Sequence, residues 1–210
     1  TYILQELIPK VYDILVYGLR RNNGEVILAG QYIKDRWSDD GGGSHGMLTC
    51  KLPDYLQLDS LFILLNRIDY TGLFSVEYGL VGKKAYFYEI NLRNDGTSHL
   101  FYQAGANLPL CWVNDCRKKE NKSSVRITED GWNINEIYDF INVLKGKISW
   151  SKYRTDRKEA KIFHYYSDED KAPWRAAKKR AIWDIFLRAF LLKFRPYIVY
   201  MKSKLDVLTQ

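Results

Sequence analysis

The amino-acid sequence predicts an α+β fold, in which an antiparallel sheet with packed helices is followed by a helical C-terminal extension. Two pairs of strand-like stretches, each separated by turn residues, indicate hairpins. Apolar residues at helical spacing indicate helices between and after them. The chain has 210 residues, 46% of them hydrophobic, which is enough for the core of one domain with an appendage. We expect one domain over residues 1–113 and a mixed, mainly helical extension over residues 114–210.

Strand signals dominate the beginning of the chain. Residues 2–7 form a short apolar run typical of a strand. Residues 11–20 and 25–34 flank Asn22-Asn23-Gly24, and Asn-Gly between two such stretches is a strong hairpin signal. Residues 38–46 are mostly Asp, Gly and Ser, so we expect a flexible loop there.

The later elements follow from apolar spacing. Residues 56–68 have apolar side chains at helical intervals, with Asp54 as the expected N-cap. Residues 74–81 and 85–92 form a second hairpin around Gly82. Beyond them we expect a short helix over 99–105, an amphipathic helix over 133–144, a strand over 161–166 and a long basic helix over 174–195.

The second hairpin carries the candidate chemistry, because its polar residues share one face. Successive side chains of a strand point to opposite faces, so matching the apolar faces of the two strands places Glu77 opposite Glu89. A three-residue loop over 82–84 meets that requirement. Two carboxylates in this arrangement lie about 5 Å apart at Cβ and repel each other, unless a divalent cation lies between them.

Asn91 and Arg93 continue the same face of the hairpin. Carboxylate and amide oxygens are hard ligands suited to magnesium, and a planar guanidinium suits a phosphate or carboxylate bound beside the metal. The pattern therefore favours a magnesium site with Glu77, Glu89 and Asn91 as ligands. The alternative interpretation is an exposed polar face, whose glutamates pair with neighbouring lysines or with Arg93.

The spacing of these residues resembles the magnesium-binding signature of the ATP-grasp superfamily. Glu77 is followed twelve residues later by Glu89-Ile90-Asn91-Leu92-Arg93. Residues 5–9, Gln-Glu-Leu-Ile-Pro, resemble the hinge strand whose backbone holds adenine in that superfamily. Residues 104–109 and 170–173 are similar to later segments of D-aspartate ligase-like carboxylate–amine ligases. The similarity is good over the first expected domain and thin beyond it.

This resemblance implies a ligase that joins a carboxylate to an amine through an acyl phosphate, using ATP and magnesium. The two glutamates and the amide of the hairpin would bind magnesium, with two ions expected. Arg93 would steady the transferring phosphoryl group. Lys34 and Arg36 would lie near the phosphates or the carboxylate substrate, although a solvated strand end explains them equally well.

The resemblance also implies where the nucleotide lies. Gln5, Glu6 and Ile8 would line the adenine pocket, and Asp13 would approach the ribose or the substrate. ATP-grasp enzymes clasp ATP between two subdomains, and the first of these lies upstream of the hinge. We therefore expect the chain to be the carboxyl-terminal half of such an enzyme, with weak ATP binding and little or no activity by itself.

Charge and cysteine content limit the possible partners of the chain and its cellular compartment. The net charge of +7 suits nucleic acid, anionic lipid or phosphorylated small molecules. Paired glutamates would repel a phosphate backbone, so we expect small-molecule carboxylate and amine partners and no nucleic acid. The basic C-terminal helix has an apolar stripe suited to core packing, a homodimer contact or peripheral membrane contact. The three cysteines form no CxxC pair, which indicates a reduced, cytoplasmic setting.

Overall fold

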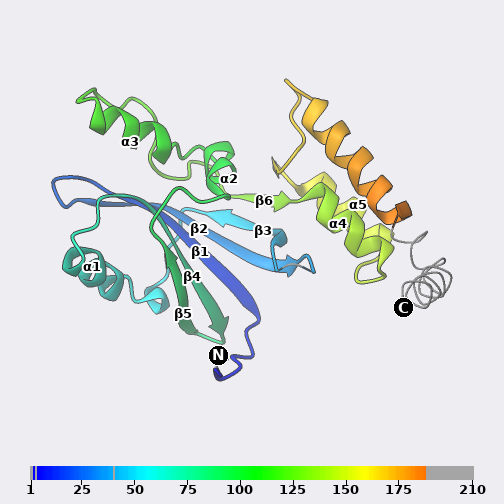
Figure 1. The fold of residues 1–210 in the computed structure, drawn as a ribbon, viewed down its shortest axis with the longest axis horizontal. Coiled ribbons are helices and arrows are strands. Elements are labelled where there is room, and N and C mark those ends of the chain that lie inside the picture. The colour runs from blue at the N-terminus through cyan, green and yellow to red at the C-terminus, as the bar shows by residue number, and fades with distance from the viewer. Residues whose placement is uncertain (1, 3, 40, 188–210) are drawn as a thin grey trace, which may run out of the picture. The chain divides into compact units, whose positions relative to one another are not determined.

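The computed structural model describes residues 2, 4–39 and 41–187 of the chain (Figure 1). These residues belong to two compact units, Thr1–His164 and Tyr165–Gln210. The first unit contains a seven-stranded sheet with helices on both faces. In the second unit, residues 172–187 form a helix.

The sheet has the strand order β5-β4-β1-β2-β3-β6-β7. All neighbouring strands are antiparallel except β6 and β7. The predicted α+β fold with an antiparallel sheet is therefore confirmed, with one parallel pair at its end. The strands are β1 (Tyr12–Arg20), β2 (Val26–Trp37), β3 (Gly43–Thr49), β4 (Gly72–Val81), β5 (Lys84–Asn91), β6 (Gly131–Ile134) and β7 (Ile162–Phe163).

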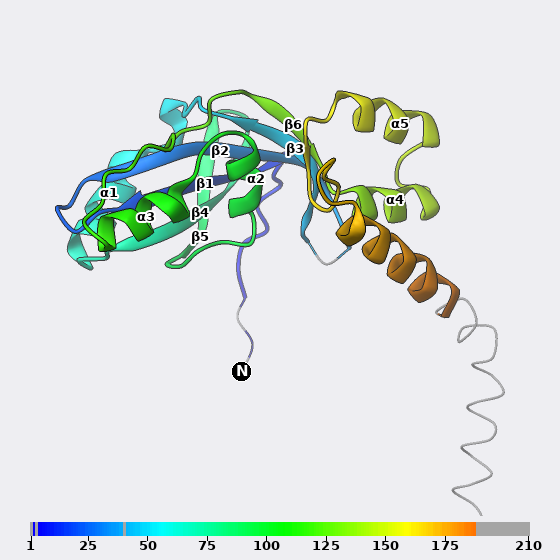
Figure 2. The same ribbon diagram turned by 90° about the horizontal axis from the view of Figure 1, so that it is seen from above.

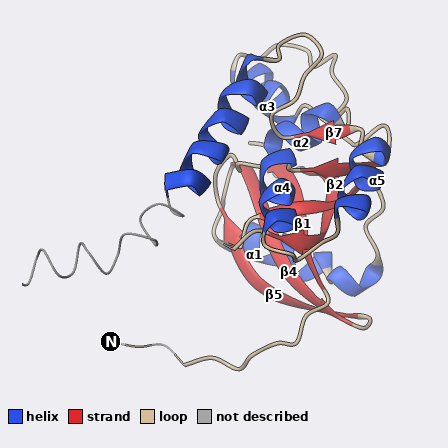
Figure 3. Cartoon of the chain, turned by 90° about the vertical axis from the view of Figure 1, so that its right-hand side faces the viewer, coloured by secondary structure: helices blue, strands red, loops and turns tan. Residues whose placement is uncertain are grey.

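Helices cover both faces of this sheet (Figure 3). A 3-10 turn and α1 pack on one face, where Leu61 and Leu65 of α1 meet the apolar side of β4. On the other face Leu100 and Phe101 of α2 and Leu108 of α3 pack over β1 to β3. The helical elements are η1 (Asp54–Leu56), α1 (Leu58–Arg67), α2 (Ser98–Gln103), α3 (Leu108–Cys116), α4 (Glu136–Leu144) and α5 (Trp150–Glu159).

The first hairpin forms the centre of the sheet, as its sequence predicts. Strands β1 and β2 meet at the Asn-Asn-Gly turn, where Gly24 has a φ of 86° and Arg21 N–H donates to Glu25 O at 2.8 Å. A left-handed residue in a tight turn favours glycine. Eight consecutive residues of β1 are buried, because each face of this central strand lies against a different helical layer.

Two expectations about the beginning of the chain are wrong. The described residues before β1 contain no strand, and Tyr2 and Leu4 are almost fully exposed. The expected loop over residues 38–46 ends early, because β3 begins at Gly43. A Cβ on Gly46 would lie 2.3 Å from Ile33 O. Glycine at this position therefore marks a close approach of two strands rather than a flexible loop.

The helix boundaries also differ from the prediction. Asp54 starts the 3-10 turn, and the N-cap of α1 is Gln57 in a left-handed conformation. Helix α3 was not predicted, although Asn107 caps it and accepts a hydrogen bond from Leu110 N–H at 3.1 Å. Helix α5 was not predicted either, because it is mostly polar and lacks an apolar stripe.

The segment after α3 extends the sheet (Figure 2). Residues 131–134 pair with β3 as β6, so the helix expected from residue 133 starts only after Asn135, which caps α4. Helices α4 and α5 lie at this end of the sheet, against β3 and β6. The domain division expected after residue 113 falls inside α3.

The long basic helix is confirmed over residues 172–187, and the remainder of the expected range to 195 lies outside the described residues. Among the helices that the structure describes, none has the length and apolar content needed to cross a bilayer. Cys50 and Cys116 are exposed and Cys111 is buried, all three as free thiols.

Candidate functional site

The β4–β5 hairpin places Glu77 directly opposite Glu89, as the sequence predicts. The predicted loop is nevertheless wrong. Val81 pairs with Lys84, so the turn contains the two residues Gly82 and Lys83, and Gly82 has a φ of 60°. A two-residue turn alone would bring the wrong faces of the strands together, because side chains alternate with a period of two.

A β-bulge restores the predicted pairing. The register shifts between Glu77 and Tyr78, and Tyr88 is the extra residue on β5. A bulge adds one unpaired residue to a strand, so every later residue of that strand pairs one position out of step with the earlier ones. The side chains that face each other across the hairpin change accordingly. Ser75 consequently faces Asn91. The face alternation, rather than the turn length, is therefore the part of the prediction that holds.

Two polar side chains of β5 and Arg93, which follows the strand, form a hydrogen-bonded row along one face. Asn91 Nδ2 donates to Glu89 Oε1 at 3.0 Å, and Arg93 Nη2 donates to Asn91 Oδ1 at 3.1 Å. Arg93 Nη1 also donates to Asn94 O at 3.2 Å. Because these hydrogen bonds link Glu89 to Asn91 and Asn91 to Arg93, the structure brings the carboxylate, amide and guanidinium together on one side.

Lys34 joins this group from β2. Its Nζ lies 3.0 Å from Glu77 Oε2, and its side chain is only 8% exposed. Glu77 and Lys34 lie on either side of the central strand, where their β1 neighbours are Leu15 and Asp13. The lysine therefore reaches over β1 and offsets part of the negative charge of the glutamate pair.

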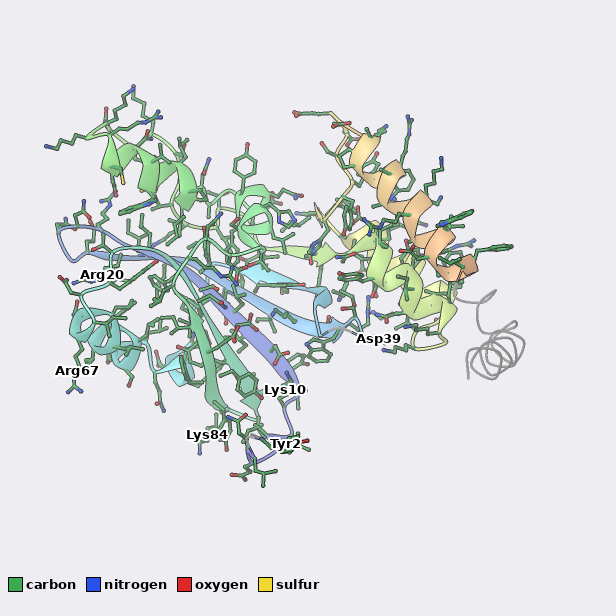
Figure 4. The ribbon with its side chains drawn as sticks, in the orientation of Figure 1. Tyr2, Lys10, Arg20, Asp39, Arg67 and Lys84 are labelled. Carbon is green, nitrogen blue, oxygen red and sulfur yellow. The ribbon has the colours of Figure 1, made fainter. Side chains whose placement is uncertain are left out.

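Asp13 lies next to Lys34 in the sheet and is held by two donors. Lys10 Nζ lies 2.6 Å from Asp13 Oδ1, and Trp37 Nε1 donates to Asp13 Oδ2 at 2.6 Å. Lys10 Nζ also lies over the ring of Tyr88, 5.2 Å from its centroid. Figure 4 shows Lys10 at the end of the sheet where the chain enters. Lys10, which was not predicted as a site residue, thus adds a positive charge beside the site.

Arg36 points to a different part of the molecule. Its Nη2 lies 2.5 Å from Asp139 Oδ2 in α4 and 2.8 Å from Asp156 Oδ2 in α5, and both carboxylates are almost completely buried. Burial opposes the positive charge of Arg36, but the two carboxylates hold its pKa above the ordinary value. The guanidinium therefore fastens β2 to α4 and α5, and the structure does not bring it to Glu77.

The candidate adenine residues precede β1. Gln5 and Glu6 are exposed and Ile8 is half-buried, in an irregular segment over residues 4–10. This segment meets the sheet where Val11 N–H donates to Leu80 O at 2.9 Å. A role for these three residues in nucleotide binding stays a prediction.

Asp95, a buried acid that contacts the hairpin through Ser75 of β4, was not predicted as a site residue. Asp95 accepts hydrogen bonds from Ser75 Oγ at 2.7 Å and from both the backbone N–H and the hydroxyl of Thr97 at 2.5 Å. Burial alone would raise the pKa of Asp95, but these hydrogen bonds and the charge of Lys34 hold it below its ordinary value. The Asp-Gly-Thr sequence signals this turn, because Asp often accepts from the N–H two residues later.

The residues of the hairpin fit a magnesium ion only in part. Within the described ranges, no three His, Cys, Asp or Glu side chains form a metal-binding cluster. The available donors are Glu77, Glu89 and the amide oxygen of Asn91. Magnesium usually binds one or two carboxylates and completes its octahedron with substrate phosphates and water. This donor set is therefore suited to magnesium that arrives together with a phosphorylated substrate.

Solved structures share this architecture. The ATPase subunit of phosphoribosylaminoimidazole carboxylase from Aquifex aeolicus matches with a TM-score of 0.53 and 15% identity, over 62% of this chain and 42% of that one. N5-carboxyaminoimidazole synthetase from Staphylococcus aureus, solved in complex with ADP, matches with a TM-score of 0.54 and 11% identity, over 70% of this chain and 40% of that one. The chain therefore has an ATP-grasp fold.

The likeness to these two structures is one of fold. The chain covers less than half the length of either structure. No protein-family model matches the sequence, and a search of curated proteins found no match.

Proposed function

We propose that the chain is part of an ATP- and magnesium-dependent ligase that joins a carboxylate to an amine. The observation that supports this most is the pairing of Glu77 with Glu89, beside the buried ammonium of Lys34, on one face of an ATP-grasp sheet. Like charges opposite each other in a sheet are unfavourable. A cation-binding role gives a physical reason for this arrangement, because the ion pair of Lys34 with Glu77 offsets only part of the negative charge of the two glutamates.

Each polar residue of the hairpin has a role in this proposal. Glu77, Glu89 and Asn91 would hold the magnesium, for which two ions are proposed, and the metal would offset the negative charge of the ATP phosphates. Arg93 and Lys34 would steady the phosphoryl group and the acyl phosphate. Arg36 is left out, because buried carboxylates already engage its guanidinium.

The proposed reaction has two steps. A carboxylate oxygen of the substrate attacks the γ-phosphorus of ATP, which releases ADP and forms an acyl phosphate. An amine then attacks the acyl carbon, which releases phosphate and leaves an amide. Positioning and positive charge account for most of the catalysis in such phosphoryl transfers. The site needs no protein nucleophile for either step.

Nucleotide binding is proposed at the beginning of β1. Gln5, Glu6 and Ile8 would contact adenine, and Asp13 would lie toward the ribose or the substrate. Because the chain matches only 42% and 40% of the two solved structures, we propose that it binds ATP weakly by itself. A test of the site should therefore detect weak binding.

Paramagnetic Mn²⁺ supplied with ATP provides such a test, since it broadens NMR signals near its binding site even at low occupancy. We expect broadening of the backbone amides of the β4–β5 hairpin. Glu89→Gln should weaken this effect at least ~10-fold, because it removes a carboxylate ligand. Glu129→Gln, an exposed acid outside the hairpin, is the matched control. Hairpin signals that stay sharp, or that broaden equally in Glu89→Gln, contradict the proposal.

A further inference from the structure

The helix over residues 172–187 is the only helix among the described residues of the second unit (Figures 1 and 2), and its two sides differ in exposure. Along one side of the helix, Ala181 is 8% exposed, and Trp174, Ala177 and Ile185 are half-buried. These positions recur at three- and four-residue intervals, as expected for one side of a helix. The remaining side of the helix is exposed to solvent.

Large apolar side chains occupy the exposed side in the later turns of this helix. Trp183 is 66% exposed and Phe186 is 71% exposed. Ile182 and Leu187, their neighbours on the helix surface, are also exposed. Single exposed apolar residues are ordinary, but four adjacent ones that include two aromatic rings indicate a contact surface.

Positive charge occupies the exposed side one to two turns earlier. Arg175, Lys178 and Lys179 line a shallow hollow of about 330 Å³, together with Trp174 and Ile182. Lys178 Nζ lies 5.2 Å from the centroid of the Trp174 ring. The hollow therefore combines cationic and apolar chemistry within two turns of one helix.

The whole positive net charge of the protein comes from residues 171–210, which include this helix. The chain contains 32 Lys or Arg and 25 Asp or Glu. Residues 171–210 hold ten of the basic residues and two of the acidic ones, which leaves 22 basic and 23 acidic residues in residues 1–170. Such a charge asymmetry between parts of a chain indicates an anionic partner for the basic part.

We propose that the exposed face of this helix docks on the surface of a membrane that contains anionic lipid. Cations in the early turns would lie among the phosphate headgroups, and Trp183 and Phe186 would enter the boundary of the acyl chains. Tryptophan favours that boundary because its ring is apolar and its N–H is polar. The helix lies on the membrane and does not cross it.

Anionic lipid fits this face better than the two other partners with which the sequence is compatible. Nucleic acid would satisfy the cations and stack on aromatic rings, but would leave Ile182 and Leu187 in water. A second copy of the chain would bury the apolar residues, but it carries the same positive charge and would repel. Lipid matches both the charge and the apolar side chains.

Flotation of the chain with vesicles tests the proposal. We expect it to float with vesicles of phosphatidylcholine and phosphatidylglycerol, and to stay behind with phosphatidylcholine alone. Lys178→Gln with Lys179→Gln should weaken binding about 25-fold, from about fivefold per cation. Trp183→Ala with Phe186→Ala should weaken it at least ~10-fold. Circular dichroism confirms that each variant is folded.

Two matched variants control for charge and apolar area elsewhere. Lys119→Gln with Lys122→Gln removes two exposed lysines, and Tyr102→Ala removes an aromatic ring that is 61% exposed. Both should float like the unmodified chain. Three results overturn the proposal: no flotation with anionic vesicles, equal loss in the control variants, or a dimer or an RNA complex that depends on this face while flotation is absent.

Discussion

Lys34 and Glu77 form an ion pair across the central strand of the sheet, with 3.0 Å between Nζ and Oε2. The lysine side chain is 8% exposed, so it has little access to water as a substitute partner. Glu77 also faces Glu89. The ammonium of Lys34 therefore partly neutralises the two glutamates that we propose as magnesium ligands.

Removing the carboxylate of this pair should destabilise the fold. In Glu77→Gln the Lys34 ammonium keeps its buried position without an ionic partner, and we expect a loss of about 2–4 kcal/mol in the free energy of unfolding. Urea denaturation measures it. Lys34→Met combined with Glu77→Gln should recover part of the loss. A double variant whose loss equals the sum of the two single losses would show that the pair is uncoupled.

The ion pairs of Arg36 should contribute strongly to stability. Asp139→Asn removes one of the two buried carboxylates that hold the guanidinium, and the expected loss is about 3 kcal/mol. Lys161→Ala breaks an exposed pair with Glu129 and should cost less than about 1 kcal/mol. Equal effects in thermal or chemical unfolding would mean that burial of Asp139 is unimportant.

His164 should make the fold sensitive to acid. Burial and the neighbouring His99 lower the pKa of His164 from 6.5 to about 3. Between these values the unfolded chain binds a proton that the folded chain does not, so stability falls as the pH falls through this window. The slope is about 1.4 kcal/mol per pH unit. His164→Phe should flatten this part of the curve of unfolding free energy against pH. An unchanged curve would contradict the assignment.

Gly30 should tolerate no side chain. Its φ is 143°, and a Cβ would lie 2.5 Å from the backbone oxygen of Thr49. We expect Gly30→Ala to destabilise the fold by at least about 2 kcal/mol. Gly96→Ala is the matched control, because a Cβ there meets nothing within 4 Å, and its effect should stay within about 0.5 kcal/mol. Chemical denaturation of both variants gives the comparison.

The pairing of Glu77 with Glu89 shows how far sequence reasoning reaches. The requirement that apolar faces match was enough to predict which residues oppose each other. It was not enough to predict how the chain achieves this, because a three-residue loop and a two-residue turn with a bulge at Tyr88 satisfy it equally. Turn choice depends on small local energies, whereas the matched apolar faces are buried against α1.

Lys34 and Arg36 show where that reasoning ends. Both were expected near the phosphates or the substrate, and they are only two residues apart. The structure directs Lys34 to Glu77 and Arg36 to Asp139, which lies 103 residues further along the chain. A register shift between the two residues in the β2–β3 pairing separates their surroundings. Neither partner leaves a local signal in the sequence.

Sequence pattern alone was enough to predict the two hairpins, the alternation of their faces and the polar row from Glu89 to Arg93, because these depend on period and turn chemistry over short stretches. Only the tertiary structure decided that Lys34 joins the glutamates, that Arg36 fastens α4 and α5, and that glycine-rich residues 43–46 belong to a strand. Those outcomes depend on contacts between residues far apart in the chain, and such contacts form only when the layers pack.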